Sequence, residues 1–182
     1  ATFTPNGLER GVMPAAQFYR LNADLVGANV ATAQSIIGKG VTLSAGTAYA
    51  FEAVLAISKS AGVTGHSVGI GFGGTATLNN IAYSALLTAG STSLTNDGVG
   101  TVGEYIQTAA NTTFSNGSST SATRFLSYAL KGTISVNAGG TLIPQYTLSA
   151  APGGAYTTAA GSYFLIYPIG TAGADVSVGT WA

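Results

Sequence analysis

Strict alternation between residues 47 and 74 constrains the fold of this chain more than any other feature of its sequence. From Tyr49 to Ile57 the odd positions are apolar, and from His66 to Phe72 every second residue has a large side chain. A period of two predicts a β-strand with one buried face. A short connector that contains glycine joins the two runs. The sequence therefore predicts an antiparallel hairpin at the centre of an all-β domain.

The second run has an unusual opposite face. Ser67, Gly69, Gly71 and Gly73 alternate with its large residues. A face made of serine and glycine carries almost no side chains, so another backbone can approach it closely. We therefore expect Gly69 and Gly71 to contribute to a contact between chains.

Composition limits the kinds of partner that the chain can have. Its 182 residues suit one domain, and only 7% of them are charged, against roughly 25% in an ordinary soluble domain. Six basic residues balance six acidic ones, which excludes a basic surface for nucleic acid. No apolar run is long enough for membrane insertion. A near-neutral surface lacks the repulsion that keeps monomers apart, which favours self-association.

The last strongly apolar run of the chain does not alternate. Residues 162–169 read Ser-Tyr-Phe-Leu-Ile-Tyr-Pro-Ile. A strand that is apolar on both faces needs cover on both. One face can belong to the core, whereas the other needs a partner chain. We therefore expect an interface between chains that includes Tyr163, Phe164, Leu165 and Tyr167.

The remaining segments predict a single domain. We divide the chain into an N-terminal arm, residues 1–12, and one domain, residues 13–182. Residues 77–87 fit both helical spacing and alternation, and the strand patterns on both sides favour a strand. A second pair of strands is expected on either side of the turn at residues 137–140. Pro144 lies in the return strand and cannot donate to a ladder, so that strand is expected at an edge or with a bulge.

Two motifs resemble catalytic signatures but lack their required context. Residues 65–69 match the hydrolase pattern G-x-S-x-G, which needs a helix after the serine and a separate histidine base. His66 is the only histidine in the chain. Residues 69–74 match G-x-G-x-x-G, which needs an acidic residue about 20 positions later. No Asp or Glu occurs between Glu52 and Asp97. We predict no enzymatic activity and no cofactor.

Metal and sugar sites need side chains that folding brings together. His66 has no clustered Asp, Glu or second His beside it, so no metal site is predicted. The acids are scattered along the sequence, which leaves open a carboxylate pair assembled by folding. Tyr105 and Tyr156 lie beside polar loops and are candidates for stacking on a sugar ring. Asn116, in the polar loop at residues 115–121, is a candidate hydrogen-bonding partner for the same glycan.

Several segments resemble known jelly-roll families. Residues 46–51, Gly-Thr-Ala-Tyr-Ala-Phe, resemble the Gly-x-Tyr-x-Phe strand of the complement and tumour-necrosis-factor families, with one extra residue. Residues 162–168 resemble the final Phe-Leu-Leu-Tyr-Pro strand of those families. Residues 51–74, 131–146 and 149–154 resemble jelly-roll domains of tailed-bacteriophage virion proteins.

This resemblance implies an antiparallel two-sheet jelly-roll sandwich that forms a compact homotrimer, with aromatic residues of the terminal strands near the threefold axis. It implies a non-enzymatic structural protein of the virion surface, in contact with other virion proteins. The chain contains no stalk of heptads or repeats, which favours a capsid-decorating or cementing trimer. The alternative is the receptor-binding head of a tail fibre or spike, which contacts a host-surface glycan. The calcium-binding acids of some complement-type proteins have no matching cluster here.

Overall fold

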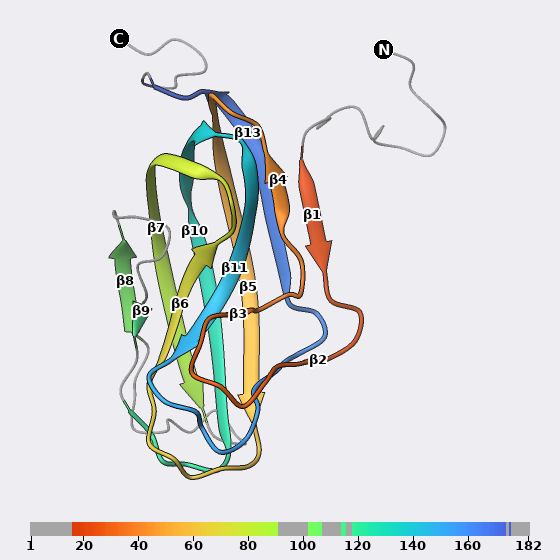
Figure 1. Ribbon diagram of the computed structural model, residues 1–182, viewed down its shortest axis with the longest axis vertical. Helices are drawn as coiled ribbons and strands as arrows, with labels where there is room; N and C mark the ends of the chain where they lie inside the picture. The colour runs from red at the N-terminus through yellow and green to blue at the C-terminus, as the bar shows by residue number, and fades with distance from the viewer. Residues whose placement is uncertain (1–15, 91–101, 107–113, 116–117, 174, 176–182) are drawn as a thin grey trace.

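The computed structural model describes residues 16–90, 102–106, 114–115, 118–173 and 175, and this part of the chain contains thirteen strands and no helix (Figure 1). The strands form two antiparallel sheets. The predicted all-β class and the two-sheet sandwich are therefore confirmed, and so is the strand at residues 77–87. The predicted N-terminal arm, residues 1–12, lies outside the described residues.

The larger sheet has eight strands, and six of them follow one another side by side. In spatial order these are β1 (Gln17–Arg20), β13 (Tyr163–Thr171), β5 (Thr47–Lys59), β10 (Arg124–Ala138), β7 (Thr77–Gly90) and β8 (Val102–Ile106). The short strand β12 (Thr157–Thr158) pairs with β5 and with β2 (Leu25–Val26). We call this layer the large sheet.

The second layer, which we call the small sheet, has five strands. These are β3 (Gln34–Ser35), β11 (Gly140–Leu148), β6 (Val68–Gly73) and β9 (Phe114–Ser115) in spatial order, with β4 (Val41–Leu43) also paired to β11. Neighbours in sequence often lie in different layers: β4, β6, β9 and β11 belong to the small sheet, whereas β5, β7, β10 and β13 belong to the large one.

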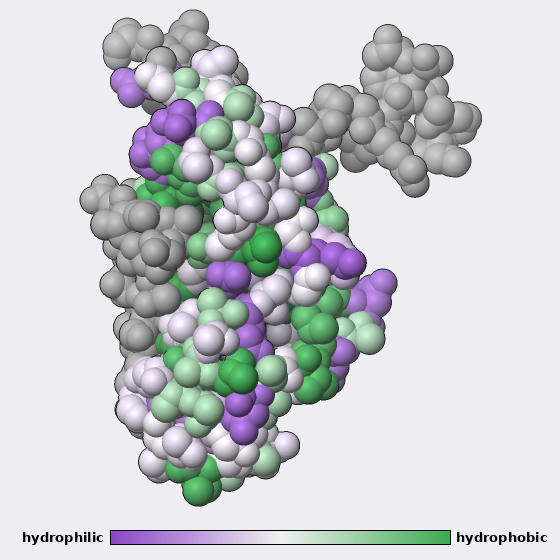
Figure 2. Space-filling model, viewed as in Figure 1, coloured by the Kyte–Doolittle hydropathy of each residue, from purple (hydrophilic) through white to green (hydrophobic). Residues whose placement is uncertain are grey.

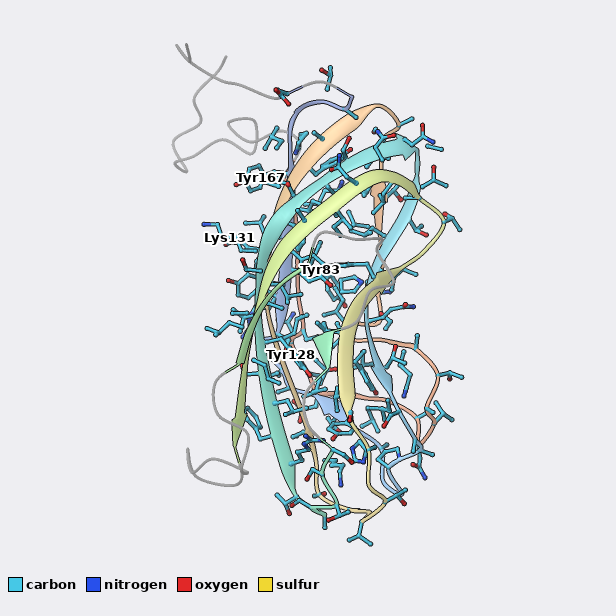
Figure 3. The ribbon with its side chains drawn as sticks, turned by 90° about the vertical axis from the view of Figure 1, so that its left-hand side faces the viewer. Tyr83, Tyr128, Lys131 and Tyr167 are labelled. Carbon is cyan, nitrogen blue, oxygen red and sulfur yellow. The ribbon has the colours of Figure 1, made fainter. Side chains whose placement is uncertain are left out.

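The core lies between the two layers, and Figure 3 shows Tyr83 and Tyr128 within it. Its centre is a group of aromatic rings around Phe51. The ring centroid of Phe51 is 5.3 Å from that of Phe72, 5.9 Å from that of Tyr83 and 5.7 Å from that of Phe164. Such aromatic pairs add about 0.5–1.5 kcal/mol each to the free energy gained by burial.

The predicted central hairpin is wrong. β5 and β6 are consecutive, but β5 pairs with β10, β13 and β12, and β6 pairs with β11 and β9. The connector at residues 60–67 carries the chain from the large sheet to the small sheet. The apolar faces of β5 and β6 then pack against the same core from opposite sides. Phe51 and Phe72 therefore meet across the sandwich and not along one sheet.

Pro144 does not lie in an edge strand, because β11 has the small-sheet strands β3 and β4 on one side and β6 on the other. On the first side β3 ends at Ser35, opposite Gln145, and β4 begins at Val41, opposite Leu142, so neither strand is paired with Pro144. This interruption accommodates a residue without an N–H group.

The side of the molecule in Figure 2 shows hydrophobic and strongly hydrophilic residues only in small scattered groups, as expected for a chain with few charges.

Candidate functional site: the outer face of the large sheet

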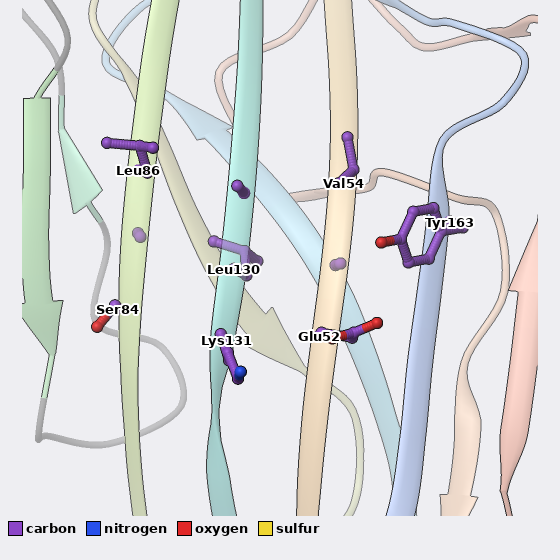
Figure 4. Close-up of a pocket in the computed structure, with 10 residues that line it drawn as sticks. Glu52, Val54, Ser84, Leu86, Leu130, Lys131 and Tyr163 are labelled. Carbon is purple, nitrogen blue, oxygen red and sulfur yellow. The ribbon is translucent and has the colours of Figure 1, made fainter.

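The register of the large sheet brings eight side chains together on its outward side. In one row Leu165, Glu52, Lys131 and Ser84 are cross-strand neighbours, and in the next row Tyr163, Val54, Ala129 and Leu86 are. Residues directly opposite each other in an antiparallel pair lie on the same side of the sheet. We call these eight residues the outer face, and Figure 4 shows most of them.

All residues of the outer face except Leu165 line a shallow hollow with apolar walls. Its volume is about 570 Å³, and its lining includes Val54, Leu86 and Tyr163. Ala129 and Ser84 contribute only short side chains between these walls. Val54 is 39% exposed and Leu86 is 46% exposed, so both present hydrocarbon to water in the isolated chain.

The apolar surface continues beyond the hollow. Phe18 of β1 is opposite Leu165, and its ring lies 5.6 Å from that of Tyr163. Contiguous exposed apolar surface on a folded protein is characteristic of an interaction site.

Glu52 and Lys131 are the two charged members of the outer face, and they are direct cross-strand partners. Figure 4 shows the Glu52 side chain directed toward β13, whereas that of Lys131 runs along its own strand. One carboxylate and one ammonium on an open surface give a face without net charge. The eight residues include no His, and their hydroxyl groups are those of Ser84 and Tyr163.

The predicted interface residues of the final strand separate into two groups. Tyr163, Leu165 and Tyr167 point outward and are partly exposed, and Figure 3 shows Tyr167 on the same side of the large sheet as Lys131. Phe164 points inward and is 3% exposed. Its predicted place in an interface is wrong, because the alternation of β13 turns it into the core between the sheets.

The two predicted interface glycines lie in β6 of the small sheet. Gly69 and Gly71 are both buried within one chain. They are paired through the backbone with Thr147 and Gln145 of β11. Because they present no exposed surface, the prediction that they contact a second chain is wrong.

Of the three predicted glycan residues, Tyr156 is the one whose side chain the structure describes. Tyr156 is 1% exposed, and its hydroxyl lies 2.8 Å from His66 Nε2. Its predicted role as a stacking platform is wrong, because the ring packs inside the protein. Tyr105 lies in β8 opposite Ser84, but its side chain is outside the described part. Asn116 lies outside the described residues, so its role stays a prediction.

His66 is wholly buried and has a defined hydrogen-bonding state. Its Nδ1 lies 2.7 Å from the carbonyl oxygen of Thr64. A carbonyl only accepts hydrogen bonds, so Nδ1 carries the proton and Nε2 of the neutral ring accepts the hydroxyl hydrogen of Tyr156. Burial lowers the pKa of His66, and the charges of Arg124 and Lys59 lower it further, whereas the bond to Thr64 opposes both effects.

The pairing of His66 with Thr64 and Tyr156 leaves Ser67 without a base. Both ring nitrogens of His66 are already hydrogen-bonded, and the Ser67 backbone N–H donates to Ser149 Oγ at 2.8 Å. The context of the hydrolase motif is therefore missing in the structure as well: β6 follows it where a helix would be required.

Two buried cations were not identified from the sequence. Lys59 is 4% exposed and Arg124 is 1% exposed, and they are cross-strand partners at the end of β5 and the start of β10. The sequence contained a signal for the burial of Lys59, because this residue follows the odd-numbered residues of β5 that face the core. We call Lys59, His66, Arg124 and Tyr156 the polar end cluster.

The described residues contain no group of three His, Asp or Glu side chains placed to hold a metal ion. In the described part of the chain, no helix has the length and apolar character needed to cross a membrane. The sequence matches no protein family model, and comparison with curated proteins and with solved structures gave no match.

Proposed function

We propose that this chain is a non-enzymatic structural protein that associates with copies of itself through the outer face of the large sheet. The observation that carries this proposal is the exposed apolar surface formed by Val54, Leu86 and their neighbours. Removing such surface from water stabilises an assembly by about 25 cal/mol for each Å² buried. Few charges oppose the association, because the outer face holds one acid and one base.

The order of the strands supports a jelly roll as the finer description of the sandwich. Successive strands alternate between the sheets from β4 to β7 and again from β9 to β12. A jelly roll consists of two such Greek-key halves. The strands β7 and β8, paired with each other, then extend the large sheet beyond β10.

With that fold, the resemblance to tailed-phage virion proteins leads to a specific role. The protein is a homotrimer that decorates or cements a phage capsid and contacts other virion proteins there. The outward side chains of β13, including Tyr163 and Tyr167, lie in the contact between the three copies. A receptor-binding head of a tail fibre is the alternative role of the same trimer.

Self-association is tested with two variants of the outer face and one control. Leu86→Glu and Val54→Glu each place a carboxylate in the contact, where burial of an unpaired charge is unfavourable. Val63→Glu changes a still more exposed valine in the connector after β5. Light scattering at micromolar concentration should give a trimer for the parent and for Val63→Glu, and a monomer for the two outer-face variants. A monomeric parent, or trimeric outer-face variants with unchanged circular dichroism, would contradict the proposal.

The virion role needs a separate experiment, because a trimer can serve many functions. Gold-labelled antibody against the protein should mark the capsid of the native particle in electron micrographs. Label confined to the tail tip would favour the receptor-binding alternative, and a glycan array would then be the next measurement. Absence of label from the particle would contradict both.

A further inference from the structure

Three connecting segments meet at the end of the sandwich where β5 finishes and β10 begins. They are residues 60–67, 118–123 and 149–156, which we call the end loops. The first two are joined by backbone hydrogen bonds in both directions between His66 and Ser119, of 3.2 and 3.0 Å. The first and third are in close contact, because a Cβ atom added to Gly62 would lie within 2.6 Å of the backbone of residues 152–154.

The two buried cations of the polar end cluster hold these loops by their carbonyl groups. Lys59 Nζ lies near four carbonyl oxygens, two in each of the first two end loops. They belong to Gly62 (2.7 Å), Ala61 (3.2 Å), Ser121 (2.5 Å) and Ala122 (3.2 Å). Arg124 Nη1 donates to the carbonyl oxygen of His66 at 3.2 Å. Two positive charges therefore lie beside carbonyl dipoles at this end.

His66 connects the same region to the third end loop through Tyr156. The Tyr156 ring packs in turn against that of Tyr146 in β11, at 6.1 Å between centroids. Asp24 accepts a hydrogen bond from the Ala160 N–H, Glu52 lies on the outer face, Glu104 lies in β8, and Asp175 follows β13. The charges of Arg124 and Lys59 act on His66, and the Tyr156 hydroxyl is hydrogen-bonded to its ring.

Adding a proton to His66 would disturb each of these contacts. The proton would bind Nε2, which would then donate, so the Tyr156 hydroxyl would have to turn its own hydrogen toward another buried acceptor. A third positive charge would also enter a cluster in which the charges of Arg124 and Lys59 already disfavour a charged ring. The protonated ring is therefore more stable where water can reach it, which requires the end loops to separate.

We propose that the polar end cluster is an acid-sensitive latch: protonation of His66 releases the end loops while the two sheets stay folded. The proposal goes beyond self-association, because the latch lies at one end of the sandwich and not on the outer face. It concerns the mobility of residues 60–67, 118–123 and 149–156 in mildly acidic solution.

Hydrogen exchange followed by mass spectrometry tests the latch at about pH 7.5 and about pH 5.5, with the intrinsic pH dependence of exchange removed. The end loops should exchange several-fold faster at the lower pH, at most about tenfold for each pH unit, whereas the centre of β10 should not change. His66→Gln is the control, since its side-chain oxygen can accept from Tyr156 and it does not ionise. This variant should lose the acid response. An unchanged acid response in His66→Gln would overturn the proposal, and so would equal protection of the parent's loops at both pH values.

A second measurement needs no variant, because the chain has a single histidine. The ¹⁵N resonances of the ring report both its tautomer and its protonation. The parent should show the Nδ1–H tautomer at neutral pH, and ring protonation should follow the same pH dependence as loop exchange. A ring that titrates at its ordinary pKa while the loops stay protected would show that His66 does not control them.

Discussion

At the scale of single residues, Lys59 illustrates how this chain buries charge although it has few acids. Removing an ammonium group from water costs several kcal/mol. Hydrogen bonds from a charged donor to carbonyl oxygens offset that cost, at about 1.5–3 kcal/mol each. The four carbonyl groups near Lys59 Nζ come from segments 60 residues apart, so one side chain fixes the relative position of two loops.

Replacement of Lys59 by methionine should therefore destabilise the fold. Lys59→Met keeps the length of the side chain but removes every donor, which leaves the carbonyl groups without this partner. We expect the free energy of unfolding to fall by about 1–3 kcal/mol, as measured by urea denaturation. Lys39→Met, at an exposed position, should change it by about 0.5 kcal/mol or less. Equal stability of the two variants would contradict this role of Lys59.

At the scale of the element, β13 serves two surfaces at once. Phe164 and Ile166 are buried in the core, whereas Tyr163 and Leu165 point away from it. The apolar run at residues 162–169 is thus the sum of two short apolar faces. The inward face stabilises the chain itself, and the outward face is free to contact a second chain.

Adjacent residues of β13 should consequently give opposite phenotypes. Phe164→Ala creates a cavity beside Phe51 and Phe72 and should lower the free energy of unfolding by about 3–5 kcal/mol. Leu165→Ala should cost the isolated chain less than about 1 kcal/mol but weaken the proposed trimer. Chemical denaturation and sedimentation equilibrium separate the two effects. A trimer unaffected by Leu165→Ala would remove the outward face of β13 from the contact.

Alternation determined which side chains face inward, but not which strands pair. The odd residues of β5 were predicted to share a face and they do, because that pattern is a local property of an extended chain. The pairing of β5 with β10 and β13 depends on residues far away in the sequence. Tyr156 likewise had a polar loop beside it, and only the folded chain shows that it meets His66, 90 positions earlier.

At the scale of the whole molecule, buried tyrosines should make the sandwich sensitive to alkali. Burial raises the pKa of Tyr146 to about 12 and that of Tyr128 higher still, whereas tyrosines of an unfolded chain ionise near pH 10. The folded state therefore retains protons that the unfolded state releases. Its stability is fully present below about pH 10 and is lost progressively as the pH rises toward 12.

Urea denaturation at a series of pH values checks this expectation. The free energy of unfolding should be constant between about pH 8 and pH 9 and should then fall as the pH rises further. Tyr146→Phe should show a smaller decrease, because one of the two groups is gone. The Tyr146 hydroxyl is buried without a hydrogen-bond partner, so this variant should match the parent near neutral pH. An identical decrease in both proteins would assign the effect to other groups.

The position of β5 between β10 and β13 has a consequence for synthesis on the ribosome. β5 ends at Lys59, but β13, which completes its pairing, ends only at Thr171. At elongation rates of about 5–20 residues per second, roughly 5–20 s pass before both edges of β5 can be covered. During that interval nascent chains on neighbouring ribosomes expose the same unpaired edge. The yield of folded protein should then depend on chaperones that shield the growing polypeptide.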